Sequence, residues 1–445
     1  MHGIVRSDPA SLLEIELGSY PFARLRGELS TGAWEQLMTA GEDARGLLDG
    51  RTLWSINSTA RGGGIAEMQR TLWPYWRDAG LDARWLVLTG TPAFFRLTKR
   101  LHNLLHGCTV ASPGISDHEL FARVGRAASA HAIELVAPGD VVILQDPQTA
   151  ALVVPLKRAG AVVVWRCHVG ADRSNDAVEA AWRFLLPYIE EADAFIFTRR
   201  AFVPPTLDPR RVGLLTPAID PCSPKNGALE AGRARAILER AGLAPQHGPL
   251  VVALARWDRL KDPVGIIQAF ALHVEDPRAS LVVAGPAIVA DDPEGGRVLS
   301  EARAALRRLP TSRRDRIRLA ALHMDDLETN ALLVNALQRE ATVIVKKSLQ
   351  EGFGLGVTEG MWKAKPVVAT RVGGHRDQVV HGRTGLLVDD PSDLRAFAAA
   401  IDRVLDDPAL ALELGGVARE RVRARFLADR HFVSWARVLA RLPVG

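Results

Sequence analysis

The most informative stretch of this sequence is VIVKKSLQEGFGLGVTEGMW, residues 343–362. Its apolar start predicts a strand that ends at Lys346, and the glycine-broken loop that follows carries Glu351. A helix is then expected to begin near Leu355, with Glu359 in its early turns. The free backbone N–H groups at such a helix start can hold a phosphate, and the two carboxylates can accept hydrogen bonds from sugar hydroxyls. The stretch therefore predicts a strand–loop–helix unit with a ligand site at the carboxyl end of the strand.

The alternation of predicted strands and helices continues along the chain on both sides of this stretch. From about residue 52 onward, short β-rich apolar runs alternate with longer helical patterns, which is typical of βαβ units and a largely parallel sheet covered on both faces. Strands are predicted in the first half at Thr52–Asn57, Arg84–Thr89, Asp140–Leu144, Ala161–Cys167, Ala194–Thr198 and Val212–Leu215. In the second half they are predicted at Leu250–Ala255, Ser280–Ala284, Ile317–Ala320, Thr342–Lys346 and Pro366–Thr370.

The chain length predicts two domains. Its 445 residues exceed what one hydrophobic core supports, since single cores stop growing beyond about 250–300 residues. A proline-rich, non-periodic run at 216–226 interrupts the α/β rhythm and indicates a junction. We expect an N-terminal domain at 1–222 with a helical cap at 1–50, a hinge at 223–248, a C-terminal domain at 249–425, and a terminal helix at 426–445 that packs across the junction.

Composition excludes several classes of protein. The hydrophobic share of 47% and the charged share of 24% are those of an ordinary globular protein. The N-terminus lacks an apolar run of signal-peptide length, and no stretch approaches the roughly 20 apolar residues of a membrane span, so a cytoplasmic protein is expected. The net charge of +5 is small and its basic residues are scattered, which argues against nucleic acid as a partner. The cysteines show no metal-ligand spacing and are expected to be reduced thiols.

Two further motifs follow predicted strands. The first strand runs into Gly62, Gly63 and Gly64, where a glycine-rich turn lets the backbone approach a ligand and a helix start offers N–H groups to an anion. The alternative is an ordinary tight turn, and the run is not the GxGxxG of dinucleotide binding. Arg256 and Lys261 follow the first strand of the second half, where two cations suit a diphosphate. Taken alone, an Arg and a Lys after a strand are more often solvated surface charges than ligands.

Together these motifs resemble a known family. Glu351 and Glu359 form the Glu-x7-Glu motif, and Arg256 and Lys261 the Arg-x4-Lys pair, of the retaining glycosyltransferases with two facing Rossmann-like domains. Within that family the chain looks most like the trehalose glycosyltransferring synthases and the related trehalose phosphorylases. The resemblance covers nearly the whole chain and includes the glycine loop and the runs Ile56–Thr59, Asp146–Gln148, Trp165–His168, Ile219–Pro221, Asp291–Gly295 and Lys346–Leu355. It implies an α/β fold of GT-B architecture, with a cleft between the domains.

The resemblance also implies roles for individual residues. Arg256 and Lys261 would bind the diphosphate, Glu351 would bind hydroxyls of the donor sugar, and Glu359 would bind the nucleotide ribose. The donor site would be completed by Gly62, Gly63, Gly64, Gly352, Phe353, Gly354 and Leu355. The expected catalytic residues are His168, Arg256, Lys261 and Glu351, and the expected acceptor-binding residues are Asp146, Gln148, Arg166 and His168.

The chain departs from the synthases at two positions. These enzymes commonly carry an Asp two residues after the histidine, where this chain has Gly170, and a His before the Asp-Pro-Gln run, where it has Gln145. Both positions lie in the N-terminal domain, which lines the acceptor site in such enzymes. The departures therefore concern the acceptor and leave the donor motifs intact.

The reaction implied is that of a trehalose-synthase-like hexosyltransferase. It would move a hexose, expected to be glucose, from UDP-, ADP- or GDP-glucose to a hydroxyl of a sugar or cyclitol, with retention at the anomeric carbon. No Asp-x-Asp motif lies near the donor loop, so no metal and no further cofactor are expected. The alternatives are a trehalose phosphorylase that uses glucose 1-phosphate and phosphate, and a pseudo-glycosyltransferase that only binds the donor. The sequence leaves the nucleobase, the acceptor and a homodimer open.

Overall fold

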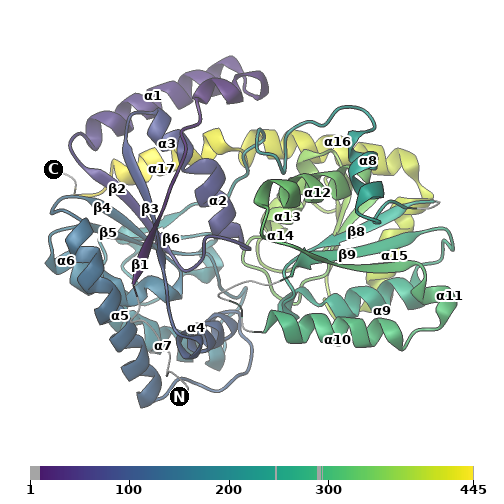
Figure 1. Ribbon diagram of the computed structural model, residues 1–445, viewed down its shortest axis with the longest axis horizontal. Coiled ribbons are helices and arrows are strands. Elements are labelled where there is room, and N and C mark those ends of the chain that lie inside the picture. The colour runs from purple at the N-terminus through teal and green to yellow at the C-terminus, as the bar shows by residue number, and fades with distance from the viewer. Residues whose placement is uncertain (1–10, 246–247, 288–291, 293, 444–445) are drawn as a thin grey trace, which may run out of the picture.

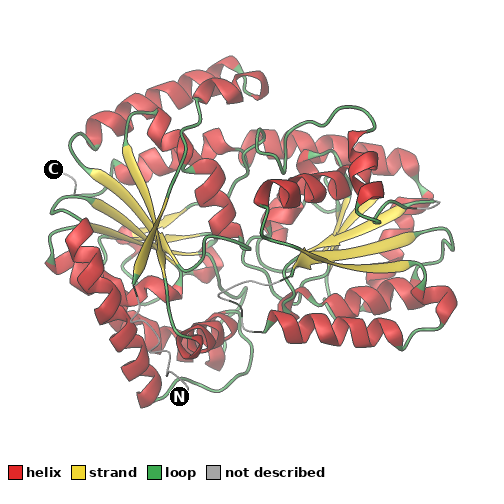
Figure 2. Cartoon of the chain, viewed as in Figure 1, coloured by secondary structure: helices red, strands yellow, loops and turns green. Residues whose placement is uncertain are grey.

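The structure is a computed structural model that describes residues 11–245, 248–287, 292 and 294–443. The N-terminal residues on which the cytoplasmic expectation partly rests, and Asp291 and Pro293 of the Asp291–Gly295 run, lie outside the described residues. None of the helices in the described part is long and apolar enough to cross a membrane. Two α/β halves lie side by side, each with a twisted sheet between layers of helices (Figures 1 and 2).

The first half contains a sheet of seven described strands in the order β1-β3-β2-β4-β5-β6-β7. All neighbouring strands are parallel except β1, which pairs antiparallel with β3. The strands are β1 Leu12–Ile15, β2 Thr52–Asn57, β3 Asp82–Leu88, β4 Val141–Gln145, β5 Val162–Cys167, β6 Ala194–Phe197 and β7 Val212–Leu214. The central strands β4 and β5 are buried at every position, as expected for parallel strands covered on both faces.

Helices cover both faces of this sheet. The α-helices are α1 Thr31–Leu47, α2 Gly64–Leu72, α3 Pro74–Asp78, α4 Pro92–Leu105, α5 Ile115–Leu135, α6 Val153–Arg158 and α7 Asp176–Ile189. Short 3-10 helices lie at Phe22–Glu28, Pro147–Leu152, Arg200–Phe202 and Pro209–Arg211. Successive residues of a strand point to opposite faces, so Trp165 packs in the core with α4, α5 and α7, whereas Val164 packs in the core with α1, α2 and α3.

The second half contains an all-parallel sheet of six described strands in the order β10-β9-β8-β11-β12-β13. The strands are β8 Leu250–Leu254, β9 Ser280–Pro286, β10 Ile317–Leu322, β11 Val343–Lys346, β12 Val367–Thr370 and β13 Leu386–Val388. Its helices are α8 Arg233–Arg240, α9 Pro263–His273, α10 Gly295–Arg307, α11 Thr311–Arg314, α12 Leu327–Glu340, α13 Leu355–Trp362, α14 His375–Gln378, α15 Leu394–Asp406 and α16 Pro408–Arg425, with a 3-10 turn at Arg259–Lys261. The predicted fold class, two Rossmann-like α/β halves, is confirmed.

The last helix, α17 Ala428–Leu439, returns to the first half and packs along α1 (Figure 1). Phe432 of α17 stacks on Trp76 with ring centroids 4.1 Å apart and meets Phe22 edge-on at 5.0 Å. In the described part, the chain thus crosses between the sheets after β7 and again before α17. We propose the first of these crossings, residues 223–248, as the hinge.

Two strands were not predicted. β1 lies within residues 1–50, which the sequence analysis interprets as a helical cap, and β13 follows the last predicted strand. Both are outermost in their sheets. β1 exposes Leu13 and Glu14 and so lacks a continuous buried run, and β13 has only three residues. Pairing with β3 and β12 determines the conformation of each.

Candidate functional site

A cavity of about 540 Å³ lies between the two halves. The first half contributes its glycine loop, one face of α4, and the residues that follow β4 and β5. The second half contributes the residues that follow β8, the end of β9, and the loop between β11 and α13. These are the carboxyl ends of parallel strands, where ligands of open α/β sheets bind. The fold therefore brings the glycine loop of the first half and the Arg-x4-Lys and Glu-x7-Glu motifs of the second half to one cavity.

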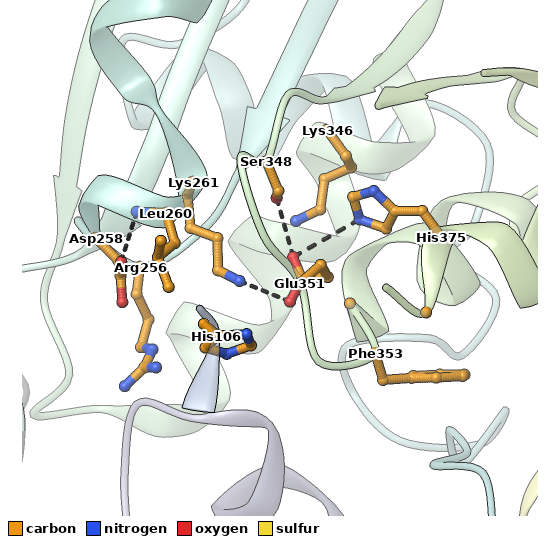
Figure 3. Close-up of polar contacts among 12 residues, drawn as sticks. His106, Arg256, Asp258, Leu260, Lys261, Lys346, Ser348, Glu351, Phe353 and His375 are labelled. Atoms are coloured by element: carbon orange, nitrogen blue, oxygen red, sulfur yellow. Dashed lines mark hydrogen bonds and ion pairs between the residues drawn. The ribbon is translucent and has the colours of Figure 1, made fainter. Parts of the chain in front are cut away.

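Glu351 lies at the centre of a polar cluster on the second-half wall (Figure 3). Lys261 places its Nζ 2.6 Å from Glu351 Oε1, and Ser348 donates its hydroxyl to Oε2 at 3.0 Å. His375 Nε2 lies 3.6 Å from the same Oε2. Burial raises the pKa of Glu351, but Lys261, and after it His375 and Lys346, lower that pKa to about 2. Glu351 is therefore an ionised carboxylate that can only accept hydrogen bonds.

Glu359 is held by a different set of neighbours. Gln338 of α12 donates to its Oε2 at 2.8 Å, and Lys225 Nζ lies 3.4 Å from its Oε1. Lys225 also lies 3.2 Å from Oε2 of Glu67, which belongs to α2 in the first half. Burial raises the pKa of Glu359, but Lys225 and Lys363 lower it. The two glutamates of the motif thus remain charged for separate reasons and can serve separate parts of a ligand.

The loop between the glutamates is shaped by close backbone approaches. A Cβ at Gly352 would lie 2.4 Å from the carbonyl oxygen of His168, so only glycine fits where this loop meets the first half. Gly354 has φ of 89°, in the left-handed region that favours glycine, and directly precedes α13. Leu355 approaches Gly64 of the first-half glycine loop, whose added Cβ would lie 3.2 Å from Leu355 Cδ1. The two glycine-rich loops, which both line the cavity, therefore meet each other.

Cationic side chains from α4 and from the residues after β8 lie together on the cavity wall. Arg256 Nη1 lies 3.7 Å from Asp292 Oδ2, and Lys99 of α4 reaches across to Asp258 at 2.6 Å and to Asp292 at 3.3 Å. Burial raises the pKa of Asp258, but Lys99 and Arg256 lower it well below its ordinary value. Lys99, Arg256 and Lys261 all line the cavity. A ligand with two phosphates would meet three cations here.

His168 lies on the first-half wall and is held by its neighbours. Its Nε2 lies 2.9 Å from Oε1 of Gln145, and its backbone N–H donates to Asp146 Oδ1 at 2.6 Å. Burial, and after it Arg166 and His431, hold the pKa of His168 well below its ordinary value. The ring is therefore neutral and its orientation is fixed. Gln145, a position where the chain departs from the synthases, is the residue that fixes it.

Most of the predicted site residues line the cavity. It is lined by Gly62, Gly63, Gly64, Asp146, Gln148, His168, Arg256, Lys261, Glu351, Gly352, Phe353, Gly354, Leu355 and Glu359. Arg166 is not among the residues that line it. It is buried beneath α17, its guanidinium 5.2 Å from the ring centre of Trp435, and burial lowers its pKa to about 9.

Sequence reasoning missed other residues of the site. Lys99, His102 and His106 line the cavity from α4 and the turn after it. Their spacing of three and then four residues places them on one helical face, and this polar stripe is the signal that could have found them. Lys225, from the expected hinge, also lines the cavity, but nothing in the sequence near it marks a site. Among the described residues, no group of His, Cys, Asp and Glu side chains is arranged to hold a metal ion.

Comparison with known proteins agrees with this geometry. Residues 55–204 match the family model described as trehalose synthase, N-terminal domain, and residues 235–421 match glycosyl transferases group 1. A trehalose synthase of Rubrobacter xylanophilus is 35% identical over 404 residues, which is 90% of this chain and 93% of that protein. A trehalose phosphorylase of Pleurotus pulmonarius is 26% identical over 442 residues, 89% of this chain and 58% of that protein.

A solved structure has the same fold. It is a UDP-forming α,α-trehalose-phosphate synthase from Burkholderia vietnamiensis, with a TM-score of 0.69 and 17% sequence identity, covering 87% of this chain and 98% of that chain. At this identity the likeness shows the fold alone, and the sequence relatives carry the family assignment. The chain belongs to the trehalose synthase family of glycosyltransferases and has the GT-B fold.

Proposed function

We propose that this enzyme transfers glucose from a nucleoside diphosphate glucose to a hydroxyl of a sugar or cyclitol, with retention of the α configuration. The observation that carries the proposal is the pairing of Lys261 with the ionised Glu351 at 2.6 Å, on a cavity wall that also presents Arg256. Cations for a diphosphate and a carboxylate for sugar hydroxyls thus lie side by side. That is the arrangement a nucleotide sugar requires.

The donor would lie along the second half. Arg256 and Lys261 would contact the diphosphate, and the start of α13 adds backbone N–H groups and the positive end of a helix dipole. Glu351 would accept hydrogen bonds from the sugar and Glu359 from the ribose. The glycine loop of the first half would close over the phosphates, because it already approaches Leu355.

Transfer would need no protein nucleophile. A retaining glycosidase uses two carboxylates about 5–5.5 Å apart, one of which donates a proton. Here cations hold both glutamates ionised, so neither is suited to donate a proton. We propose instead that the bond from the anomeric carbon to the diphosphate breaks while the acceptor hydroxyl attacks from the same face. An oxygen of the leaving diphosphate takes the hydroxyl proton, and Arg256 and Lys261 stabilise the charge that develops there.

His168 would act on the transferred sugar. It lines the cavity, and Gln145 and Asp146 hold it in place. Because its ring is neutral, it can hydrogen-bond a sugar hydroxyl without adding positive charge beside an oxocarbenium-like centre. A contact of this kind strengthens as the transition state forms.

A phosphorylase is the second candidate. The similarity to a trehalose phosphorylase favours it, as does the fact that a site for two phosphates also fits inorganic phosphate next to a sugar. The reaction would then release glucose 1-phosphate in place of a nucleotide. A donor-binding pseudo-glycosyltransferase is the third candidate, suggested by Gln145 and Gly170 in the acceptor half.

A product assay distinguishes the three. The enzyme is incubated with UDP-, ADP-, GDP- and TDP-glucose, each crossed with a panel of sugar and cyclitol acceptors, and in a parallel arm with trehalose and phosphate. UDP-glucose is the first donor to test, since the similar solved structure is described as UDP-forming. We expect nucleotide release coupled to a new glucoside. Turnover only with phosphate would assign a phosphorylase, and nucleotide binding without any product would assign a pseudo-enzyme.

A further inference from the structure

His106, in the turn after α4, is a cavity residue that the proposed mechanism does not use. Its Nδ1 lies 2.9 Å from the carbonyl oxygen of Gly170, so Nδ1 carries the proton and donates it. The neutral ring then leaves Nε2 as an acceptor, and Nε2 makes no hydrogen bond to any residue that the structure describes. The ring is buried, lines the cavity, and lies beside Lys261 and Glu351 in Figure 3.

Gly170 explains why this histidine can be placed here. A Cβ at Gly170 would lie 2.3 Å from Cγ of Phe202, so the packing leaves no room for a side chain. The aspartate that the synthases commonly carry at this place therefore cannot be accommodated unless Phe202 moves. The backbone carbonyl of Gly170 supports the His106 ring instead. The imidazole of His106, in the turn after α4, thus lies next to Gly170, the position at which the synthases commonly carry an aspartate.

The charged and titratable groups around His106 keep it neutral. Burial lowers its pKa most, Lys261 lowers it further, and Glu351, Asp258 and the bond to Gly170 raise it, with a result of about 4. His102, one turn earlier on α4, lies with its ring 4.6 Å away and is itself held neutral by burial. A neutral imidazole with a free Nε2 accepts hydrogen bonds but is a weak base. It is suited to binding a hydroxyl rather than to removing its proton.

We propose that His106 Nε2 accepts a hydrogen bond from a hydroxyl of the acceptor substrate, and that the His106–Gly170 pair determines which acceptor is used. The inference rests on the proposed function. Most of the residues proposed to bind the nucleotide sugar, including Arg256, Lys261, Glu351 and Glu359, belong to the second half, so the acceptor is expected between the sugar and the first half. His106 belongs to the first half, lines the cavity and lies beside Lys261 and Glu351 (Figure 3). It is therefore a specificity-determining residue of the acceptor site.

Two substitutions at this position separate the roles of the two ring nitrogens. In His106→Asn the amide nitrogen can keep the bond to Gly170, but nothing replaces Nε2. In His106→Gln the amide oxygen reaches the place of Nε2 and can still accept a hydrogen bond. His118→Asn on α5 is the matched control, since His118 bonds Tyr188 and does not line the cavity.

The kinetic parameters for donor and acceptor are then measured separately. We expect His106→Asn to lower kcat/KM for the acceptor about tenfold, the upper end for one neutral hydrogen bond, with donor KM and nucleotide affinity unchanged. His106→Gln should retain most of the activity, and His118→Asn all of it. Because the ring is neutral, the defect of His106→Asn should be the same at pH 6 and pH 8. Unchanged acceptor kinetics in His106→Asn, or a loss confined to donor KM, would overturn the inference.

Acceptor analogues identify the hydroxyl involved. The best wild-type acceptor is compared with its monodeoxy analogues in the wild-type enzyme and in His106→Asn. For one analogue the two losses should not add, because each removes the same hydrogen bond. Additive losses for every analogue would contradict the inference while leaving the proposed transfer reaction intact. Failure of the wild-type enzyme to transfer glucose to any acceptor would instead refute the proposed function, and this inference with it.

Discussion

Glu351 and Glu359 belong to one motif but differ in their neighbours, and this difference predicts different defects. Glu351 contacts Lys261 and Ser348 on the cavity wall, whereas Glu359 contacts Gln338 and is close to Lys225. We expect Glu359→Gln to weaken free nucleotide and nucleotide sugar alike. Glu351→Gln should spare free nucleotide and impair transfer. Calorimetric titration and initial rates measure the two effects, and equal losses in both assays would show that the roles are wrongly assigned.

A second test at the level of single residues concerns His168. We expect His168→Ala to lower turnover by roughly 10²-fold or more, the low end for a positioned polar group, while nucleotide binding stays intact. The expectation follows from its fixed, neutral ring on the first-half wall. Single-turnover rates at saturating donor isolate the chemical step. A variant that keeps the wild-type rate would remove His168 from the mechanism.

The sequence identified the candidate donor residues because they lie close together in two short motifs. Lys99 lies on α4 and His106 in the turn after it. Their spacing puts them on one polar helical face, but that spacing alone does not show that the face lines a cavity. Arg166 was grouped with His168, but Arg166 lies within β5 and is covered by α17, where its guanidinium contacts the ring of Trp435. His168 follows the carboxyl end of the strand and therefore reaches the cavity.

At the scale of elements, the loop before α13 depends on its contact with the end of β5. We expect Gly352→Ala to lower kcat/KM about 10²-fold, because its Cβ would lie 2.4 Å from a backbone oxygen of His168 and a shift of about 1 Å at a reacting centre costs this much. Gly416→Ala on α16 is the control, since open space surrounds that position. Wild-type kinetics in Gly352→Ala would mean that this close approach is not required.

The elements themselves were predicted unevenly. All eleven strands expected from apolar runs are present, and β2 has the predicted limits. The central strands β4, β5, β8 and β11 are buried at every position, so their sequences are largely apolar. β1 was missed because it exposes Leu13 and Glu14 and so lacks a buried apolar run, and β13 is only three residues long. Pairing with β3 and β12 decides their conformation.

At the scale of the whole molecule, buried charges connect the two halves across the cavity. Lys99 of the first half pairs with Asp258 and Asp292 of the second, and these three side chains are at most 7% exposed. A second set of contacts between the halves comes from Arg199 and Asp172 of the first: Arg199 pairs with Asp377 at 2.5 Å, and Asp172 accepts from the backbone N–H of Gly373 at 2.9 Å. Such contacts hold the two halves together.

Lys99→Met tests the first of these connections. Removing one partner of a buried ion pair costs about 3–5 kcal/mol, so the unfolding midpoint should fall. Because the pKa of Asp258 is lowered in the folded state, its ionised carboxylate stabilises the fold at pH values above about 3.9, the pKa of an unfolded Asp. This stabilisation is lost as the carboxylate becomes protonated at lower pH. The deficit of the variant should therefore be largest at neutral pH and shrink as the pH falls below about 4.

Arg259→Met is the control for that measurement. Its pair with Glu301 is exposed, and exposed pairs contribute about 0–1 kcal/mol. Thermal unfolding of both variants at several pH values gives the comparison. A midpoint unchanged by Lys99→Met, or a deficit that widens toward acid pH, would contradict the assignment of a stabilising connection across the cavity.

The central claim is that a diphosphate-bound glucose is transferred with retention by a site that has no protein nucleophile. Proton NMR of the first-formed product, made from an α-linked nucleoside diphosphate glucose, tests it most directly. We predict an anomeric signal with the small coupling constant of an α-glucoside, appearing together with the released nucleotide. A β-linked product formed from the same donor would contradict the account.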